Sequence, residues 1–171
     1  MACVLTAALA KACKDSVGGI KKAWAVELSA KDAITKTGGS ISAMTVTGPA
    51  VFLAWNFDIE MAQMTAKPVK GDEAGTVFFE QAANFRLHKW ELTKSNEIME
   101  IAKTDIMLIC LDNNGVYWLL GEENGLRWTD GGGDSGKAFG DFNGFDMAFI
   151  GKEKAMPLVV ESAVVTSLGL T

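Results

Sequence analysis

Apolar and polar residues alternate with a period of two over much of the first half of the chain, which is typical of β-strands with one buried face. Ile20 to Leu28 places aromatic and branched apolar residues between polar ones and predicts a first strand. A glycine pair at the centre of Lys36 to Ser40 predicts a turn, and Ile41 to Val46 is expected to form a short strand after it. The alternation is strongest from Val51 to Ala66, where we expect one long, half-buried strand.

A long hairpin and a helix are expected next. Lys67 to Gly75 contains a proline and two glycines and is not expected to continue a central strand, whereas Thr76 to Trp90 resumes the alternation. These segments predict a long β-hairpin whose projecting tip is Lys67 to Gly75. From Thr93 to Thr104 the apolar residues recur at helical spacing without a breaker, which predicts one α-helix.

Short strands and turns are expected in the rest of the chain. The apolar run from Asp105 to Leu111 predicts a buried strand, and Asn113 to Gly115 predicts a tight hairpin turn. Asp130 to Asp141 is rich in glycine and predicts a flexible loop that becomes ordered on contact with a partner. The remaining expected strands are Val116 to Leu120, Leu126 to Thr129, Phe145 to Ile150, and Leu158 to Val165, the last being a strand or a docking arm.

These elements together predict a mainly β fold, namely a β-sandwich or barrel with one flanking α-helix and a long protruding β-hairpin. A chain of 171 residues can bury one core, so we expect a single domain over residues 1–171. Within it we expect an N-terminal tail of about residues 1–17 and a C-terminal arm of about residues 155–171.

Charge and cysteine content narrow the partners and the compartment. The net charge of −5 and the isoelectric point of about 4.9 argue against wrapping nucleic acid, which needs clustered lysine and arginine, but they suit a surface that faces passing DNA. No stretch approaches the roughly 18 apolar residues of a membrane-spanning helix, so we predict no membrane segment. Cys3, Cys13 and Cys110 favour a reducing compartment, although a bridge between the first two stays open.

Three patterns that could carry chemistry each lack a required part. Gly131 to Lys137 is similar to a phosphate-binding loop, but Ala138 stands where a serine or threonine would hold magnesium, and poor helix formers follow. His88 is the single histidine, which excludes a multi-histidine metal site, and no glycine-flanked serine turn accompanies it. The aspartate groups lack the spacing of a calcium loop. We therefore predict no enzyme and no catalytic, cofactor-binding or metal-ligating residue.

Large aromatic residues and an exposed strand edge favour self-association. The five tryptophans lie in or at the ends of predicted strands, where such rings fill a core or an interface. They are Trp24, Trp55, Trp90, Trp118 and Trp128. A long apolar strand from Val51 to Met64 would leave backbone groups unpaired at its edge, and a second copy of the chain would protect them.

Several segments along the chain are similar to those of one protein family. They are Met1 to Thr6, Val17 to Lys22, Asp112 to Gly121, Asn124 to Leu126, Ser135 to Phe145, and Gly151 to Glu153 with the strand before it. These segments resemble tail-tube-like virion proteins of tailed bacteriophages, particularly those of phages and prophages of Bacteroidetes. Together they extend over most of the chain.

The resemblance implies a subunit that assembles with copies of itself. In this family β-barrels or sandwiches join their sheets into rings of six, a long hairpin reaches the next ring, and stacked rings form the conduit for DNA. It implies a homohexameric ring in the virion tail, assembled in the bacterial host cytoplasm beside other virion proteins, with DNA passing without specific binding. The contact residues that it implies are Lys67, Pro68, Lys70, Gly71, Asp72, Glu73, Gly131, Gly132, Gly133, Asp134, Ser135 and Lys137.

Three rival functions stay open at this point. A capsid decoration, head-tail connector or neck ring protein would share the fold but form a different ring or a trimer. A ligand- or carbohydrate-binding β-sandwich would use tryptophan and phenylalanine rings as stacking platforms. Nucleotide hydrolysis at the glycine-rich loop is the least favoured.

Overall fold

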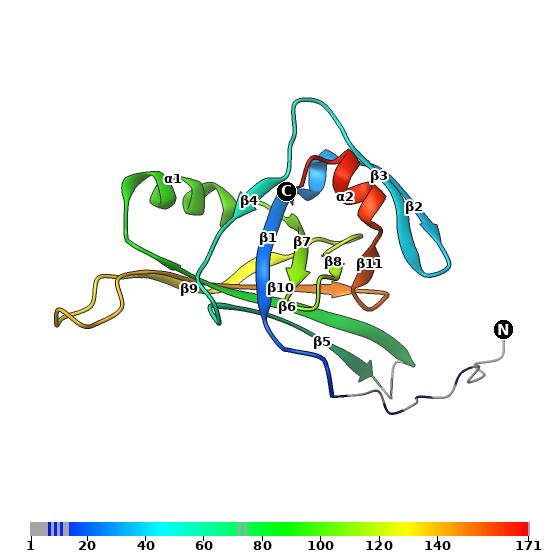
Figure 1. The fold of residues 1–171 in the computed structure, drawn as a ribbon, viewed down its shortest axis with the longest axis horizontal. Coiled ribbons are helices and arrows are strands. Elements are labelled where there is room, and N and C mark those ends of the chain that lie inside the picture. Colours follow the sequence, from blue (N-terminus) through cyan, green and yellow to red (C-terminus); the bar gives the residue numbers. More distant parts are fainter. Residues whose placement is uncertain are drawn as a thin grey trace.

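The structure is a computed structural model that describes residues 7, 9, 11, 14–71, 73 and 75–170 (Figure 1). Within these residues the fold is mainly β, because the strands form one seven-stranded sheet and one four-stranded sheet. The two sheets pack against each other as a sandwich, with a helix beside them, which confirms the predicted fold class. In Figure 1 the four-stranded sheet runs along the long axis, below the larger sheet.

The seven-stranded sheet is almost entirely antiparallel, and β11 and β3 form its one parallel pair. Its strand order is β2-β3-β11-β8-β7-β1-β4. The strands are β1 (Ile20–Glu27), β2 (Lys31–Thr37), β3 (Ser40–Val46), β4 (Leu53–Trp55), β7 (Ile106–Asp112), β8 (Tyr117–Leu120) and β11 (Leu158–Val160).

The four-stranded sheet is wholly antiparallel and has the order β5-β6-β10-β9. Its strands are β5 (Ala62–Gly71), β6 (Thr76–His88), β9 (Arg127–Asp134) and β10 (Gly144–Glu153). β5 and β6 form the predicted long hairpin. Strands β5 and β9 are the two edges of the sheet, and two further strands separate them.

Three helical segments connect or flank the sheets. A single 3₁₀ turn, η1 (Leu28–Ala30), joins β1 to β2, and α1 (Leu92–Ile101) follows β6 at the end of the four-stranded sheet. The predicted helix is thereby confirmed. A second short helix, α2 (Ser162–Ser167), packs beside β3 on the larger sheet (Figure 1).

Strand β7 explains why the hydrophobic core has two parts. Its residues 106–110 are all buried, because Ile106, Leu108 and Cys110 face the four-stranded sheet while Met107 and Ile109 face the opposite side. The first set joins aromatic residues of β6 and β10 between the sheets. The second set is covered by α2 and by the β2–β3 hairpin. A strand covered on both faces is a continuous apolar run, as the sequence predicted.

Two buried polar side chains stabilise the turns beside this core. Gln81 Nε2 donates to Ala155 O at 2.9 Å, and its Oε1 accepts from Gly121 N at 3.0 Å. The Glu153 carboxylate, 3% exposed, accepts from the backbone N–H groups of Glu123 and Asn124. Each side chain therefore satisfies backbone groups that the turn leaves without a strand partner.

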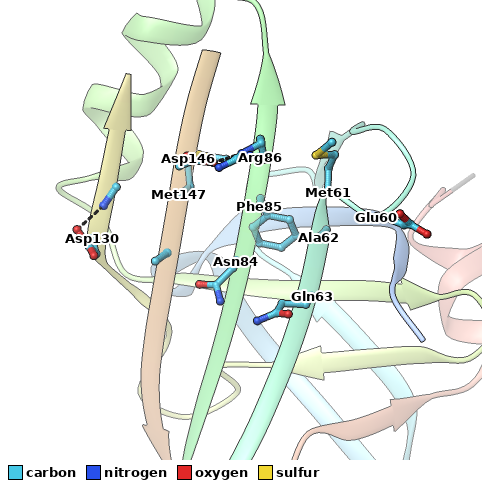
Figure 2. Close-up of a pocket in the computed structure, with 12 residues that line it drawn as sticks. Glu60, Met61, Ala62, Gln63, Asn84, Phe85, Arg86, Asp130, Asp146 and Met147 are labelled. Carbon is cyan, nitrogen blue, oxygen red and sulfur yellow. Dashed lines mark hydrogen bonds and ion pairs between the residues drawn. The ribbon is translucent and has the colours of Figure 1, made fainter. Parts of the chain in front are cut away.

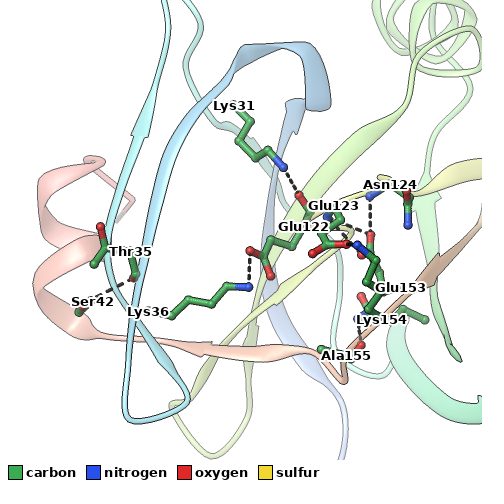
Figure 3. A network of polar contacts seen from close by, with 11 residues as sticks. Lys31, Thr35, Lys36, Ser42, Glu122, Glu123, Asn124, Glu153, Lys154 and Ala155 are labelled. Carbon is green, nitrogen blue, oxygen red and sulfur yellow. Dashed lines mark hydrogen bonds and ion pairs between the residues drawn. The ribbon is translucent and has the colours of Figure 1, made fainter. Parts of the chain in front are cut away.

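The same turn is tied to the β2–β3 hairpin by charged residues (Figure 3). Lys36 Nζ lies 2.7 Å from Glu122 Oε1, and Lys31 Nζ donates to Glu122 O at 2.7 Å. On the other side of the turn, Lys154 Nζ lies 2.8 Å from Glu123 Oε2. These contacts hold the hairpin against the end of the sandwich.

The single long strand predicted from Val51 to Ala66 is wrong. The structure divides this segment into β4 and β5, which belong to different sheets. Between them the chain turns at residues 56–61, where Met61 N donates to Asp58 O and Glu60 has a φ of 66°. The alternation persists across the turn because the chain passes from an edge of one sheet to an edge of the other.

The C-terminal segment also differs from the prediction. Leu158 to Val165 was expected to be a strand or docking arm, but the strand ends at Val160 and α2 begins at Ser162. Val164 and Leu170 are buried in the core on the outer side of the larger sheet. This segment therefore packs against its own chain.

Candidate functional site

The outward face of the four-stranded sheet carries a shallow hollow of about 380 Å³ (Figure 2). Residues paired across antiparallel strands share a face, so the pairs Gln63 with Asn84 and Arg86 with Asp146 lie side by side on this surface. Arg86 Nε and Nη2 donate to the two Asp146 oxygens at 2.6 and 2.9 Å. This bidentate geometry fixes both side chains.

Charged and aromatic residues continue along the same face toward the hairpin tip. Lys67 Nζ lies 2.7 Å from Glu80 Oε1, and Lys152 Nζ lies 5.4 Å from the centroid of the Phe78 ring. The face is therefore a mixed-charge surface on which Arg86 and Lys67 are paired with carboxylates of the same chain.

The lone histidine lies at the end of β6, next to this hollow. His88 Nε2 is 3.3 Å from Asp58 Oδ2, and its ring packs edge-on against Phe142 at a centroid distance of 5.5 Å. Both His88 and Asp58 are exposed to solvent. This is a surface contact between an imidazole and a carboxylate.

The structure contains no group of three or more histidine, cysteine, aspartate or glutamate side chains placed to hold a metal ion within its described part. Cys110 is buried, and the burial raises the pKa of its thiol to about 12. Cys3 and Cys13 lie outside the described residues. The described helices include none long and apolar enough to cross a membrane.

The first predicted contact segment, residues 67–73, lies mostly in a strand. Lys67 to Gly71 belongs to β5, where Lys67, Pro68 and Lys70 pair with residues of β6, so the prediction that it forms the hairpin tip is wrong. Pro68 is tolerated because β5 is an edge strand and one side of its backbone has no ladder partner. The turn itself starts after Gly71. Glu73 is exposed there, and Asp72 lies outside the described residues.

The second predicted contact segment, residues 131–137, begins in a strand as well. Gly131, Gly132, Gly133 and Asp134 belong to β9, so the flexible loop expected from Asp130 to Asp141 is wrong over this part. The glycines predicted a loop because glycine is usual in loops, whereas in β9 glycine permits close contacts with neighbouring strands and rings.

Two of these glycines lie close to neighbouring groups. Gly131 has a φ of 106°, and a Cβ there would lie 2.2 Å from the carbonyl oxygen of Asp146. A Cβ on Gly133 would lie 3.0 to 3.1 Å from the rings of Phe145 and Trp90. Strand β9 therefore needs glycine at residue 131, whereas a side chain at residue 133 would require the Phe145 and Trp90 rings to shift by a few tenths of an ångström.

The remaining predicted contact residues, Ser135 and Lys137, lie in the loop between β9 and β10 and are exposed. The two predicted segments are not brought together in one chain. They occupy opposite edges of the same sheet, because β5 and β9 are separated by β6 and β10.

Most tryptophans belong to the core rather than to an exposed platform. Trp24 is buried, Trp55 and Trp128 pack on Phe149, and Trp118 is partly buried against the same core. Trp90 is 48% exposed. The structure thus resolves which rings fill the core.

Two surface features were not predicted from the sequence. One is a groove between α1 and β4. It could not be expected while Val51 to Ala66 was predicted to form a single strand. The other is Phe139, which is fully exposed in the β9–β10 loop. An aromatic residue among glycines and polar residues was the available signal for this second feature.

Comparison with known proteins gives no relative for this chain. No protein-family model, curated protein or solved structure matches it.

Proposed function

We propose that the chain is a structural virion protein, a phage tail tube subunit that assembles with copies of itself into stacked rings around a DNA conduit. The observation that carries the proposal is the placement of the two candidate contact segments on β5 and β9, the opposite edges of one sheet. Edge strands offer backbone N–H and C=O groups that another strand can pair.

Joining these edges would extend the sheet from one copy to the next. The strand directions alternate from β5 through β6 and β10 to β9, so β9 of one copy meets β5 of the next antiparallel. Such a contact uses two different surfaces of the chain. Repeated by rotation, it closes into a ring.

The register of the sheet sets which residues of the two edges share a row. Gln63 of β5 lies in the same row as Asp130 of β9, because Asn84 and Ala148 connect them across the sheet. Lys67 and Lys70 lie further along β5, beyond the end of β9. In the ring we assign the outward face of the four-stranded sheet to the lumen, where the paired ions Arg86 and Asp146 limit attraction to DNA phosphate.

The test compares a charge change on the edge with one elsewhere. Negative-stain electron microscopy and sedimentation velocity over a concentration series are expected to show rings or stacked tubes for the wild-type chain. Gln63→Glu places a negative charge on β5 in the row of Asp130 and should weaken assembly, whereas Lys21→Glu on β1 should not. Wild-type monomers at every concentration, or equal assembly by both variants, would refute the proposal.

The ring size separates this function from its nearest rival. A capsid decoration, connector or neck protein would give trimers or rings of another size in the same images. Sixfold rings that stack with a continuous channel are the result expected of a tail tube.

A further inference from the structure

The loop between β9 and β10 presents an aromatic side chain on a defined turn. Ala138 to Asp141 is a tight turn in which Asp141 N donates to Ala138 O at 3.1 Å. Asp141 Oδ2 accepts from the N–H groups of Lys137 and Ala138 at 2.9 and 2.8 Å. Phe139 lies in this turn and is fully exposed. The loop therefore holds a large apolar group in solvent.

The base of the loop is anchored to the body of the protein. Asn143 Oδ1 accepts from Trp90 N at 2.8 Å, and Asn143 O accepts from Lys89 N at 2.8 Å. The Phe142 ring lies 4.6 Å from the guanidinium carbon of Arg86. In Figure 1 the loop forms the gold projection at one end of the long axis. An anchored loop loses little conformational entropy when its tip is buried by a partner.

A groove of about 430 Å³ lies between α1, β4 and the segment before β4. Its walls include Val51, Leu53 and Ile101, and Val51 and Leu53 are 64% and 55% exposed. Glu97 and Glu100 of α1 line the same groove, and Glu100 Oε1 lies 2.9 Å from Lys103 Nζ. It is an apolar slot with carboxylates at one wall, which suits an aromatic ring accompanied by a positive charge.

The register of the sheet places the loop and the groove at the same end. Asp134 pairs with Gly144, which pairs with His88, so the loop lies at the end of the sheet where β6 stops and β5 starts. The groove wall β4 leads into β5 through residues 56–61. If β9 of one copy joins β5 of the next, the loop of the first copy reaches the end that carries the groove of the second.

We propose that Phe139 of one copy inserts into the groove between α1 and β4 of a neighbouring copy. This inference rests on the proposed function, because it takes the β9-to-β5 contact as its frame. Lys137 accompanies the ring and faces the carboxylates of Glu97 and Glu100, while the Asp141 carboxylate is turned back onto its own loop. The contact buries two exposed apolar surfaces at once.

Cross-linking between singly substituted chains tests the contact without removing the aromatic ring. In a background with Cys3→Ser and Cys13→Ser, chains carrying Ala138→Cys are mixed with chains carrying Glu97→Cys and mildly oxidised. A disulfide-linked heterodimer is expected. The matched control replaces Glu97→Cys with Met156→Cys, at an exposed residue outside the groove, and should give little product.

A second measurement tests the contribution of the ring. Phe139→Ser should weaken self-association roughly tenfold or more in sedimentation velocity, because burial of a phenylalanine is lost. Met156→Ser, which also removes an exposed apolar side chain, should leave it nearly unchanged.

The outcomes separate the two proposals. Rings that form without the heterodimer, and without sensitivity to Phe139→Ser, overturn the inference and leave the tail-tube proposal standing. Wild-type chains that stay monomeric overturn both. Binding of Phe139 to lipid vesicles in place of the groove would also overturn the inference.

Discussion

Replacing Glu153 with alanine and with glutamine separates the two roles of a buried carboxylate. The side chain is 3% exposed, and it accepts hydrogen bonds from Asn124 N at 2.9 Å and from Glu123 N at 3.2 Å. Burial raises the pKa of Glu153 above its ordinary value, because the charged form loses its water. The carboxylate thus stabilises the turn by accepting hydrogen bonds, whereas burial destabilises its ionised form.

The structure sets the expected size of each effect. Glu153→Ala leaves two backbone N–H groups without their acceptor, and each such group costs about 1–3 kcal/mol, so we expect a loss of about 2–6 kcal/mol in the free energy of unfolding. Glu153→Gln keeps a carbonyl oxygen that can accept both bonds. We expect it to change the free energy of unfolding by less than about 1 kcal/mol.

The pH dependence of the free energy of unfolding follows from the direction in which the pKa of Glu153 is shifted. The folded-state pKa of Glu153 is above the unfolded value near 4.5, so its contribution is fully present below that pH and is lost as the pH rises through the folded pKa. Glu153→Gln has no such titration. The wild-type chain should therefore lose stability relative to Glu153→Gln as the pH rises above 4.5.

Urea unfolding followed by tryptophan fluorescence, repeated from pH 4 to pH 8, measures both effects. Parallel stability curves for the wild-type chain and Glu153→Gln would refute the reasoning on charge. An alanine variant as stable as the glutamine variant would refute the reasoning on the two N–H groups.

Three further predictions concern other parts of the fold. Gly131→Ala should destabilise the protein by about 2–4 kcal/mol in urea unfolding, because its Cβ meets the Asp146 carbonyl, whereas Gly132→Ala, with open space around its Cβ, should cost less than about 1 kcal/mol. Cys110, whose pKa is raised to about 12, should resist alkylation at pH 8 until denaturant unfolds the chain, as peptide mass mapping would show. Burial raises the pKa of Asp112, but hydrogen bonds donated within its turn outweigh burial and lower the pKa below its ordinary value. Asp112→Ala should therefore cost about 1–3 kcal/mol at pH 7 in the same unfolding assay. This difference from the wild-type chain should shrink as the pH falls below 3.8.

Local patterns in the sequence determined the elements that depend on residues close together in the chain. The run from Asp105 to Leu111 predicted a buried strand, and β7 is covered on both faces. The turn at Asn113 to Gly115 and the helix near Thr93 to Thr104 were predicted for the same reason, since their glycine, cap and spacing signals act within a few residues. The mainly β fold class followed from these elements.

Tertiary structure decided the features that depend on distant partners. The alternation from Val51 to Ala66 could not reveal that β4 and β5 belong to different sheets, because each faces the core with the same period. Glycines 131–133 form a strand because they pair with β10, which lies later in the sequence and is not signalled by their neighbours. The candidate contact segments were named from the sequence, but only strand order placed them on opposite edges of one sheet.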